Sequence, residues 1–255
     1  MRLSERLQAY LRTTAHGFYE AMPAPPFTCF FHPRDPLRYF NYAIPDESAA
    51  GDLGNALERL RATFRERNRL PRFEYVEGFA PGLAKALEAA GFELELRAPL
   101  MTVPAAEVAE PALRGGFEIV PASTDVRAYL TVGRRAFGKG DEPEASDEEV
   151  EARRERRDVG TALLGLLDGE PVAVSAATPP LDGLTEVAGV GVLEQARGHG
   201  LGCAMTAAAA RDAATRGAEL AFLAPGSEAA QSVYVRVGFR AAEVSLYYAD
   251  PRDAR

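Results

Sequence analysis

The amino-acid sequence predicts a mixed α/β fold that occurs twice along one chain. Three observations support this prediction. Strand-like and helix-like segments alternate in the second half, a stretch rich in proline, glycine and alanine lies near the middle, and one pattern of strand, helix and strand recurs. The chain has 255 residues, which is enough for two domains of ordinary size.

The expected boundary between the domains is the segment 105–116. Prolines, glycines and alanines replace any periodic apolar pattern there, which is typical of a linker. The sequence therefore predicts a first domain over 1–104, a linker over 105–116 and a second domain over 117–255.

In the second domain, local signals mark individual elements. Ser146 followed by Glu149 forms a capping box that opens a helix, and Asp168-Gly169 is a turn dipeptide between two apolar runs. The expected strands are 117–120, 161–167, 171–177, 185–193, 219–224 and 242–248. The expected helices are 125–137, the helix opened by Ser146, 201–216 and 227–237.

An internal repeat links the two halves. Arg72–Phe92 aligns without a gap onto Glu219–Phe239, and each segment contains a strand, a helix, a Gly-Phe pair and the start of another strand. Such a pattern is common enough to arise by chance, so two copies of one fold and a chance similarity are both open interpretations.

Composition and charge exclude several classes of protein. Hydrophobic residues make up 47% and charged residues 26% of the chain, which are ordinary globular values. No apolar run approaches the roughly 18 residues of a membrane span, and no secretory signal is evident, so we expect a cytoplasmic protein without a membrane partner. The net charge of −8 argues against nucleic acid as a partner, because phosphate backbones require a basic surface.

Cysteine and histidine usage argues against a metal site. The two cysteines, Cys29 and Cys203, are too few for a disulfide framework. The three histidines, His16, His32 and His199, lack the spacing of metal ligands. We therefore expect no bound metal.

A glycine-rich loop between a predicted strand and a predicted helix is the most informative segment. Its glycines let backbone N–H groups approach a ligand, and the helix behind the loop adds partial positive charge at its N-terminus. A Walker loop is excluded because no Gly-Lys-Ser/Thr follows, and the dinucleotide pattern fails because Cys203 stands at its third glycine. The segment predicts an anion cradle, and the alternative is that the glycines only shape a tight loop.

The residues of this loop resemble a known signature. Val190-Gly191-Val192 followed by Arg197-Gly198-His199-Gly200-Leu201-Gly202 is similar to the acyl-CoA signature of the GNAT N-acetyltransferases, in which Arg or Gln is followed by two residues, Gly, any residue, and Gly or Ala. The resemblance extends in element order from Phe117 to about Asp250. It implies tandem GNAT-like folds, each with a central mixed, largely antiparallel sheet flanked by helices.

The resemblance also implies which residues bind acetyl-CoA, the expected co-substrate. The amides from Gly198 to Cys203 would hold the CoA pyrophosphate, and Val190 to Val192 would pair with the pantetheine arm. Ser227 stands where the family often has an asparagine that contacts the cofactor, and a serine there can also cap the helix.

Tyr234 is the candidate general acid. It lies four residues before Gly238-Phe239, where many GNAT members place the tyrosine that protonates the departing thiolate. A phenol with a pKa near 10 is protonated at neutral pH and can donate to sulfur. The alternative is a core residue, because Tyr234 falls on an apolar helix face.

The implied reaction is direct attack of a neutral amine on the thioester, with a backbone amide near Val192 stabilising the oxyanion. Cys203 is not expected to act as a nucleophile, because no histidine partner is identifiable. Glu186 and Glu194 lie near the expected site, but either is readily explained as an ordinary solvated residue, and no general base is assigned.

Between Asp141 and Asp158 the sequence has nine acidic and four basic residues, on the loop and helix that border the acceptor in the GNAT family. This segment is either a solvated charged helix or an edge that attracts a cationic amine, and both interpretations stay open.

We therefore expect an N-acetyltransferase that acts on an amine substrate, with a catalytic second half and a degenerate first half. In the repeat alignment Arg197, Gly200, Gly202 and Tyr234 fall on Ala50, Leu53, Asn55 and Leu87, respectively. The alternative function is a non-catalytic, regulatory module that binds acyl-CoA. The acceptor and the oligomeric state are left open by the sequence.

Overall fold

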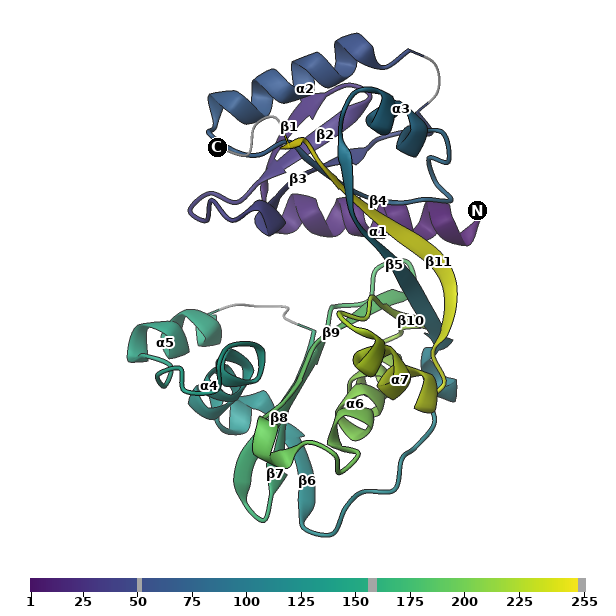
Figure 1. Cartoon of the computed structure of the whole chain (residues 1–255). Helices are drawn as coiled ribbons and strands as arrows, with labels where there is room; N and C mark the ends of the chain where they lie inside the picture. Colours follow the sequence, from purple (N-terminus) through teal and green to yellow (C-terminus); the bar gives the residue numbers. More distant parts are fainter. Residues whose placement is uncertain (50–51, 156–159, 252–255) are drawn as a thin grey trace. The chain divides into compact units, whose positions relative to one another are not determined.

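A computed structural model describes residues 1–49, 52–155 and 160–251. The chain forms two compact units. Figure 1 shows their helices and strands, coloured along the sequence. Unit 1 comprises Met1–Leu100 and Ala241–Arg255, and unit 2 comprises Met101–Arg240. Each unit has a mixed sheet flanked by helices, so the expected α/β class is confirmed.

Unit 1 contains a sheet with the strand order β1-β2-β3-β4-β11. Its strands are β1 (Glu20–Ala24), β2 (Phe27–Phe31), β3 (Asn41–Pro45), β4 (Arg72–Val76) and β11 (Arg240–Ala249), and its helices are α1 (Leu3–Phe18), α2 (Gly54–Glu66) and α3 (Leu83–Ala89). Only β3 and β4 are parallel among these neighbours. Buried side chains of α2 and α3 pack on one face of the sheet, and α1 packs on the other.

Unit 2 contains strands in the order β5-β10-β9-β8-β7-β6. The strands are β5 (Glu93–Pro104, of which the last four residues belong here), β6 (Phe117–Pro121), β7 (Thr161–Leu167), β8 (Glu170–Ala177), β9 (Leu184–Val192) and β10 (Leu220–Leu223). The helices are α4 (Val126–Phe137), α5 (Asp147–Glu155), α6 (Leu201–Thr215) and α7 (Glu228–Arg236). Apolar clusters place α4 on one face of the sheet and α6 on the other (Figure 1).

The local sequence signals of the second half are confirmed. The Ser146 amide donates to the Glu149 carboxylate at 2.8 Å and the Glu149 amide donates to Ser146 Oγ at 3.3 Å, so the capping box opens α5. Asp168 and Gly169 have φ angles of 52° and 86°, as a tight hairpin between β7 and β8 requires. The bounds of the expected elements shift by only one or two residues.

The two repeat segments have matching structures. β4 and β10 each lie beside a parallel neighbour, and each is followed by a short helix. Gly91 and Gly238 end these helices with φ angles of 86° and 106°, which favour glycine. Phe92 and Phe239 are both buried. These shared features favour two copies of one fold over a chance similarity.

The last strand of each repeat joins the sheet of the other unit. β5 follows α3 of the first repeat, and its residues Met101–Pro104 pair with β10 of unit 2. β11 follows α7 of the second repeat, and its residues Ser245–Ala249 pair with β4 of unit 1. The compact units therefore divide the chain after Leu100 and again after Arg240, whereas the sequence predicts divisions around 105–116 alone.

The beginning of the expected linker is part of unit 2. Ala105 and Val108 are buried in the apolar cluster that contains the alanines of α6. The Ala109 amide donates to the Val237 carbonyl oxygen at 3.1 Å. The composition of this segment predicts irregular backbone. It does not predict the burial of these side chains, because that depends on packing against distant residues.

A buried ion pair holds the end of β11 in unit 1, and its removal is expected to be costly. Arg61 Nε lies 2.5 Å from Asp250 Oδ2, and both side chains are buried. Asp250→Ala leaves the Arg61 guanidinium without this carboxylate, so we expect the free energy of unfolding to fall by about 3 kcal/mol in chemical denaturation. Glu77→Ala, which breaks the exposed pair with Arg97, is the control and should cost less than about 1 kcal/mol. Equal losses would contradict this assignment.

Candidate functional site

A cleft of about 460 Å³ opens in unit 2 between the end of β9, the start of α6 and helix α7. The structure brings together in its lining the predicted residues Val190, Gly191, Val192, Arg197, Gly198, Gly200, Leu201, Gly202, Cys203, Ser227 and Tyr234. Of the predicted site residues, His199 alone is outside this lining. Residues distant in sequence thus converge on one cavity.

The glycine loop leaves open space at the N-terminus of α6. Gly198 and Gly200 have φ angles of 82° and 76°, and no other heavy atom lies within 4 Å of the position that a Cβ would take at either. Gly200 is the N-cap of α6, no side chain caps it, and the first turn has no acidic residue. The first N–H groups of this 15-residue helix therefore lack intrahelical acceptors, which suits an anion.

Arg197 is fixed between the strand and helix that flank the loop. Its Nε donates to the Val192 carbonyl oxygen at 3.1 Å, and its Nη2 reaches the Ala136 carbonyl oxygen at 3.5 Å. These bonds tie the loop to the ends of β9 and α4 while the side chain stays largely exposed. A guanidinium cation is thus held at the rim of the cleft.

A β-bulge interrupts β9 beside the cleft. Val174 pairs with Gly191 and Ala176 pairs with Ala188, so Ser175 of β8 faces two residues, Gly189 and Val190. Gly189 has a φ of 60°, which favours glycine. A bulge takes backbone groups out of the regular ladder, so they become available to a ligand.

β9 and β10 pair only along the first part of β9. The parallel register runs from Leu184 with Leu220 to Glu186 with Phe222. The residues of β9 that line the cleft, from Val190 onward, lie beyond this last pair. Glu186 therefore lies at the end of the paired segment, where its amide donates to Thr178 Oγ1 at 2.8 Å.

Tyr234 reaches the cleft from α7. Ser227 caps this helix by accepting a hydrogen bond from the Ala230 amide at 3.2 Å. The Tyr234 ring is half-buried with its centroid 6.2 Å from that of Phe239, and burial raises the pKa of its hydroxyl. Among the described residues no hydrogen-bond partner occupies this hydroxyl, so a ligand can accept its proton.

Cys203 lies in the first turn of α6 with its side chain turned toward α7. Its Sγ contacts the Val233 carbonyl oxygen at 3.6 Å, and the residue is buried. No histidine lines the same cleft. The structure therefore agrees with a small packing residue at this position, and the described lining of the cleft contains no histidine that could activate a thiol.

Seven residues of the cleft were missed by the sequence analysis: Ala136, Phe137, Ala196, Ala229, Ala230, Val233 and Arg236. Ala136 and Phe137 end a helix that is far from the glycine loop in sequence, so no local motif could have placed them there. Ala230 and Val233 share the helix face of Tyr234, and that periodicity was the available signal.

Gly191 allows α4 to approach β9, and adding a methyl group is expected to disturb this contact. A Cβ at position 191 would lie 2.8 Å from Ala136 Cβ. We expect Gly191→Ala to lower the free energy of unfolding by about 1 to 3 kcal/mol, measured by chemical denaturation. Gly133→Ala, on α4 with its nearest neighbour at 3.9 Å, is the control and should instead stabilise the chain by up to about 1 kcal/mol. A neutral Gly191→Ala would contradict the close approach.

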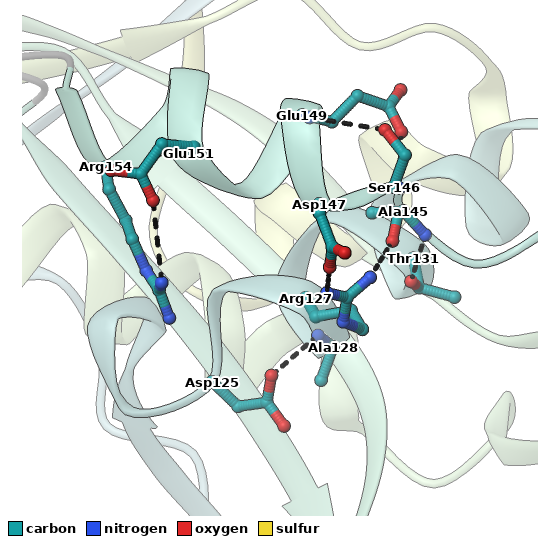
Figure 2. A network of polar contacts seen from close by, with 10 residues as sticks. All are labelled: Asp125, Arg127, Ala128, Thr131, Ala145, Ser146, Asp147, Glu149, Glu151 and Arg154. Atoms are coloured by element: carbon teal, nitrogen blue, oxygen red, sulfur yellow. Dashed lines mark hydrogen bonds and ion pairs between the residues drawn. The ribbon is translucent and has the colours of Figure 1, made fainter.

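Four of the eight described carboxylates in the acidic segment 141–158 are engaged by nearby groups, and Figure 2 shows part of this network. Asp147 pairs with Arg127, Glu149 pairs with Arg134, and Glu151 lies 3.7 Å from Arg154. Glu142 accepts hydrogen bonds from the amides of residues 139 and 140, which lowers its pKa. These pairings favour the solvated charged helix; residues 156–158 lie outside the described part of the chain.

Two further properties of the described residues bear on the class of site. They contain no cluster of three or more histidine, cysteine, aspartate or glutamate side chains that could hold a metal ion. None of the helices in the described ranges has both the length and the hydropathy of a membrane span.

Comparisons with known proteins agree with this geometry. Residues 128–239 match the model of the acetyltransferase (GNAT) family. The chain is similar to a GCN5-related N-acetyltransferase from Kribbella flavida, with 28% identity, a TM-score of 0.82, and coverage of 98% of this chain and 96% of that chain. None of the curated proteins matches the chain.

Two further solved structures share the fold at lower identity. A GCN5-related N-acetyltransferase from Sphaerobacter thermophilus has 17% identity and a TM-score of 0.61, covering 88% of this chain and 80% of that chain. A tandem GNAT protein from the clavulanic acid biosynthesis pathway has 16% identity and a TM-score of 0.64, covering 88% of this chain and 77% of that chain.

The fold and the family match together define an acyltransferase-type domain in unit 2. Residues 128–239 thus match the GNAT acetyltransferase family, and the whole chain is similar to a GNAT protein and shares its fold with a tandem GNAT protein, so the expected resemblance is confirmed. Proteins of this family use acyl-CoA as the acyl donor.

Proposed function

We propose that unit 2 is an acetyl-CoA-dependent N-acetyltransferase that acts on a primary amine. The observation that carries this proposal is the meeting, in one cleft, of an uncapped helix N-terminus with an interrupted strand and a free tyrosine hydroxyl. Release of the CoA thiol from acetyl-CoA in the presence of amines tests it.

The glycine loop fits the pyrophosphate of CoA. The open space at Gly198 and Gly200 would admit phosphate oxygens close to the backbone, and the N–H groups of the first turn of α6 would donate to them. Arg197 and Arg236 add positive charge to the lining. Acetyl-CoA supplies an acyl group activated as a thioester.

The β9 bulge supports a specific role for the backbone in the reaction. Attack by the neutral amine nitrogen on the carbonyl carbon forms the C–N bond and places negative charge on the carbonyl oxygen. The sequence analysis expects an amide near Val192 to stabilise this charge. Val192 lies in the regular ladder opposite Ala173, so we assign the role to the bulge at Gly189 and Val190.

Tyr234 would complete the transfer. When the C–S bond breaks, its electron pair stays on the sulfur, which accepts the proton of the Tyr234 hydroxyl. The amine nitrogen loses a proton to solvent, and the Tyr234 phenolate regains one from solvent. The raised pKa of Tyr234 keeps the hydroxyl protonated at neutral pH. No covalent enzyme intermediate is needed, in agreement with the position of Cys203.

We propose that unit 1 does not bind acyl-CoA. At the aligned positions, Leu53 is the N-cap of α2 with a φ of −99°, and Leu87 is fully buried in the core of unit 1. Asn55 replaces the last glycine of the signature, and Ala50 lies outside the described residues. Neither a glycine cradle nor a tyrosine proton donor is present at the aligned positions that the structure describes.

A second candidate function is a regulatory module that binds acyl-CoA without turnover. The contact between the Tyr234 and Phe239 rings favours it, because a tyrosine in such a contact can serve packing alone. In that case acetyl-CoA would stabilise the chain, and no amine would release the CoA thiol.

A further inference from the structure

Unit 2 has another cavity, of about 340 Å³, at the start of β7. Its lining includes Ser123, Val126 and Tyr129 from β6 to α4, Ala162 from β7, and three arginines. It shares no lining residue with the cleft assigned to acyl-CoA. The cavity is therefore a separate feature that the proposed acyl transfer does not use.

The described lining of the cavity is rich in arginine. Arg153, Arg154 and Arg216 line it, and none of its described lining residues is an aspartate or a glutamate. Like charges close together repel each other unless opposite charges offset them, so the partners of each arginine decide how much positive charge remains for a ligand. The lining thus has a charge that complements an oxyanion.

The three arginines differ in how far the protein itself neutralises them. Arg216 Nε lies 2.9 Å from Asp212. Arg154 lies farther from its partner Glu151, at 3.7 Å, and Figure 2 shows this pair. The Arg153 guanidinium lies over the Tyr129 ring at 5.7 Å from its centroid, and no carboxylate of the described residues pairs with it. Arg153 is therefore oriented by the ring and keeps its donors for a ligand.

The neighbouring groups suit a small acidic molecule. Arginine donors bind carboxylate and phosphate oxygens through paired, charge-assisted hydrogen bonds. The Ser123 hydroxyl adds a neutral donor, and Val126 and Ala162 provide apolar wall. We propose that this cavity is a binding site for the oxyanion group, carboxylate or phosphate, of a small molecule.

The strand register defines where this site lies relative to the bulge. Ala162 of β7 pairs with Ala176 of β8, which pairs with Ala188 of β9, next to the bulge at Gly189. Two strand spacings of about 4.8 Å separate these residues, so Ala162 in the cavity lining lies about 10 Å from Ala188 across the sheet. The site is distinct from the glycine loop, and each can be tested alone.

The proposal is tested by titrating the full chain with succinate and with inorganic phosphate at constant ionic strength, using calorimetry. We expect saturable binding of at least one probe and a weakening of about tenfold or more in Arg153→Gln, because a charged hydrogen-bonding group is lost. Arg216→Gln should also weaken binding. Arg114→Gln, an exposed arginine of unit 2 outside the cavity, is the matched control and should leave the affinity unchanged.

Two further measurements locate the probe. Tyrosine ring signals in NMR spectra, assigned with Tyr129→Phe, should shift for Tyr129 during the titration. Gly200→Asp should not change probe affinity, because it alters only the glycine loop. The tighter of the two probes identifies the natural group as carboxylate or phosphate.

The proposal is overturned if neither probe binds saturably, or if Arg153→Gln and Arg216→Gln bind as tightly as the parent chain with unchanged melting temperatures. Loss of binding in Gly200→Asp alone would also overturn it, because the probe would then occupy the loop at α6. That result would leave the proposed acyl-CoA site intact.

Discussion

Tyr234→Phe is expected to lower acyl-CoA turnover by a factor of about 10² to 10⁴ while acyl-CoA binding is retained. The substitution removes only the hydroxyl that would protonate the departing thiolate, and the ring keeps its place near Phe239. Because burial raises the pKa of Tyr234, the hydroxyl is protonated at neutral pH, and the turnover of the parent chain should fall only at a pH above the usual tyrosine value of about 10. Steady-state rates measured as a function of pH give both results.

Tyr247→Phe is the matched control for this variant. It removes a tyrosine hydroxyl from β11 in unit 1, outside the cleft, and should leave turnover unchanged. Equal turnover of Tyr234→Phe and the parent chain on a good substrate, with chemistry rate-limiting, would assign Tyr234 to packing alone.

Gly200→Asp is expected to abolish the binding of acetyl-CoA. The parent chain should be stabilised by roughly 2.7 kcal/mol when acetyl-CoA is present at about 100 times its dissociation constant, and the variant should show no such gain. The new carboxylate would enter the open space at the α6 N-terminus and repel the pyrophosphate. Thermal denaturation with and without acetyl-CoA measures the difference.

Gly169→Asp is the control that distinguishes the effect of a negative charge in the cleft from the effect of backbone strain. Gly169 has a φ of 86°, close to the 76° of Gly200, and both have open space at the Cβ position. The control thus carries a similar strain at the β7–β8 turn and should keep the full stabilisation by acetyl-CoA. A folded Gly200→Asp chain that is still stabilised would remove the glycine loop from the proposed site.

Local chemistry made much of unit 2 predictable from sequence. The Ser146 and Glu149 capping box, the Asp168-Gly169 turn and Gly238 at the end of α7 each act within a few residues, so their signals are contained in short segments. The resemblance to a family predicted that the glycine loop and Tyr234 lie in one site. Sequence spacing alone does not indicate that β9 lies next to α7.

Pairing between distant segments could not be predicted. The apolar patterns of β5 and β11 mark them as strands, but periodicity does not identify the neighbour of a strand. Only the observed pairing shows that the end of β5 joins β10 in unit 2 and that β11 joins β4 in unit 1. The bulge at Gly189 was missed for a similar reason, since an extra residue is visible only against the partner strand β8.

The central claim is that unit 2 transfers an acyl group, and the most direct test is release of the CoA thiol from acetyl-CoA across a panel of primary amines. The panel should include small amines, amino acids and peptide N-termini. We predict amine-dependent thiol release with at least one class, matched by formation of the acetylated amine and suppressed in Tyr234→Phe. Stabilisation of the chain by acetyl-CoA without amine-dependent thiol release from any member would contradict the account and identify a binding module instead.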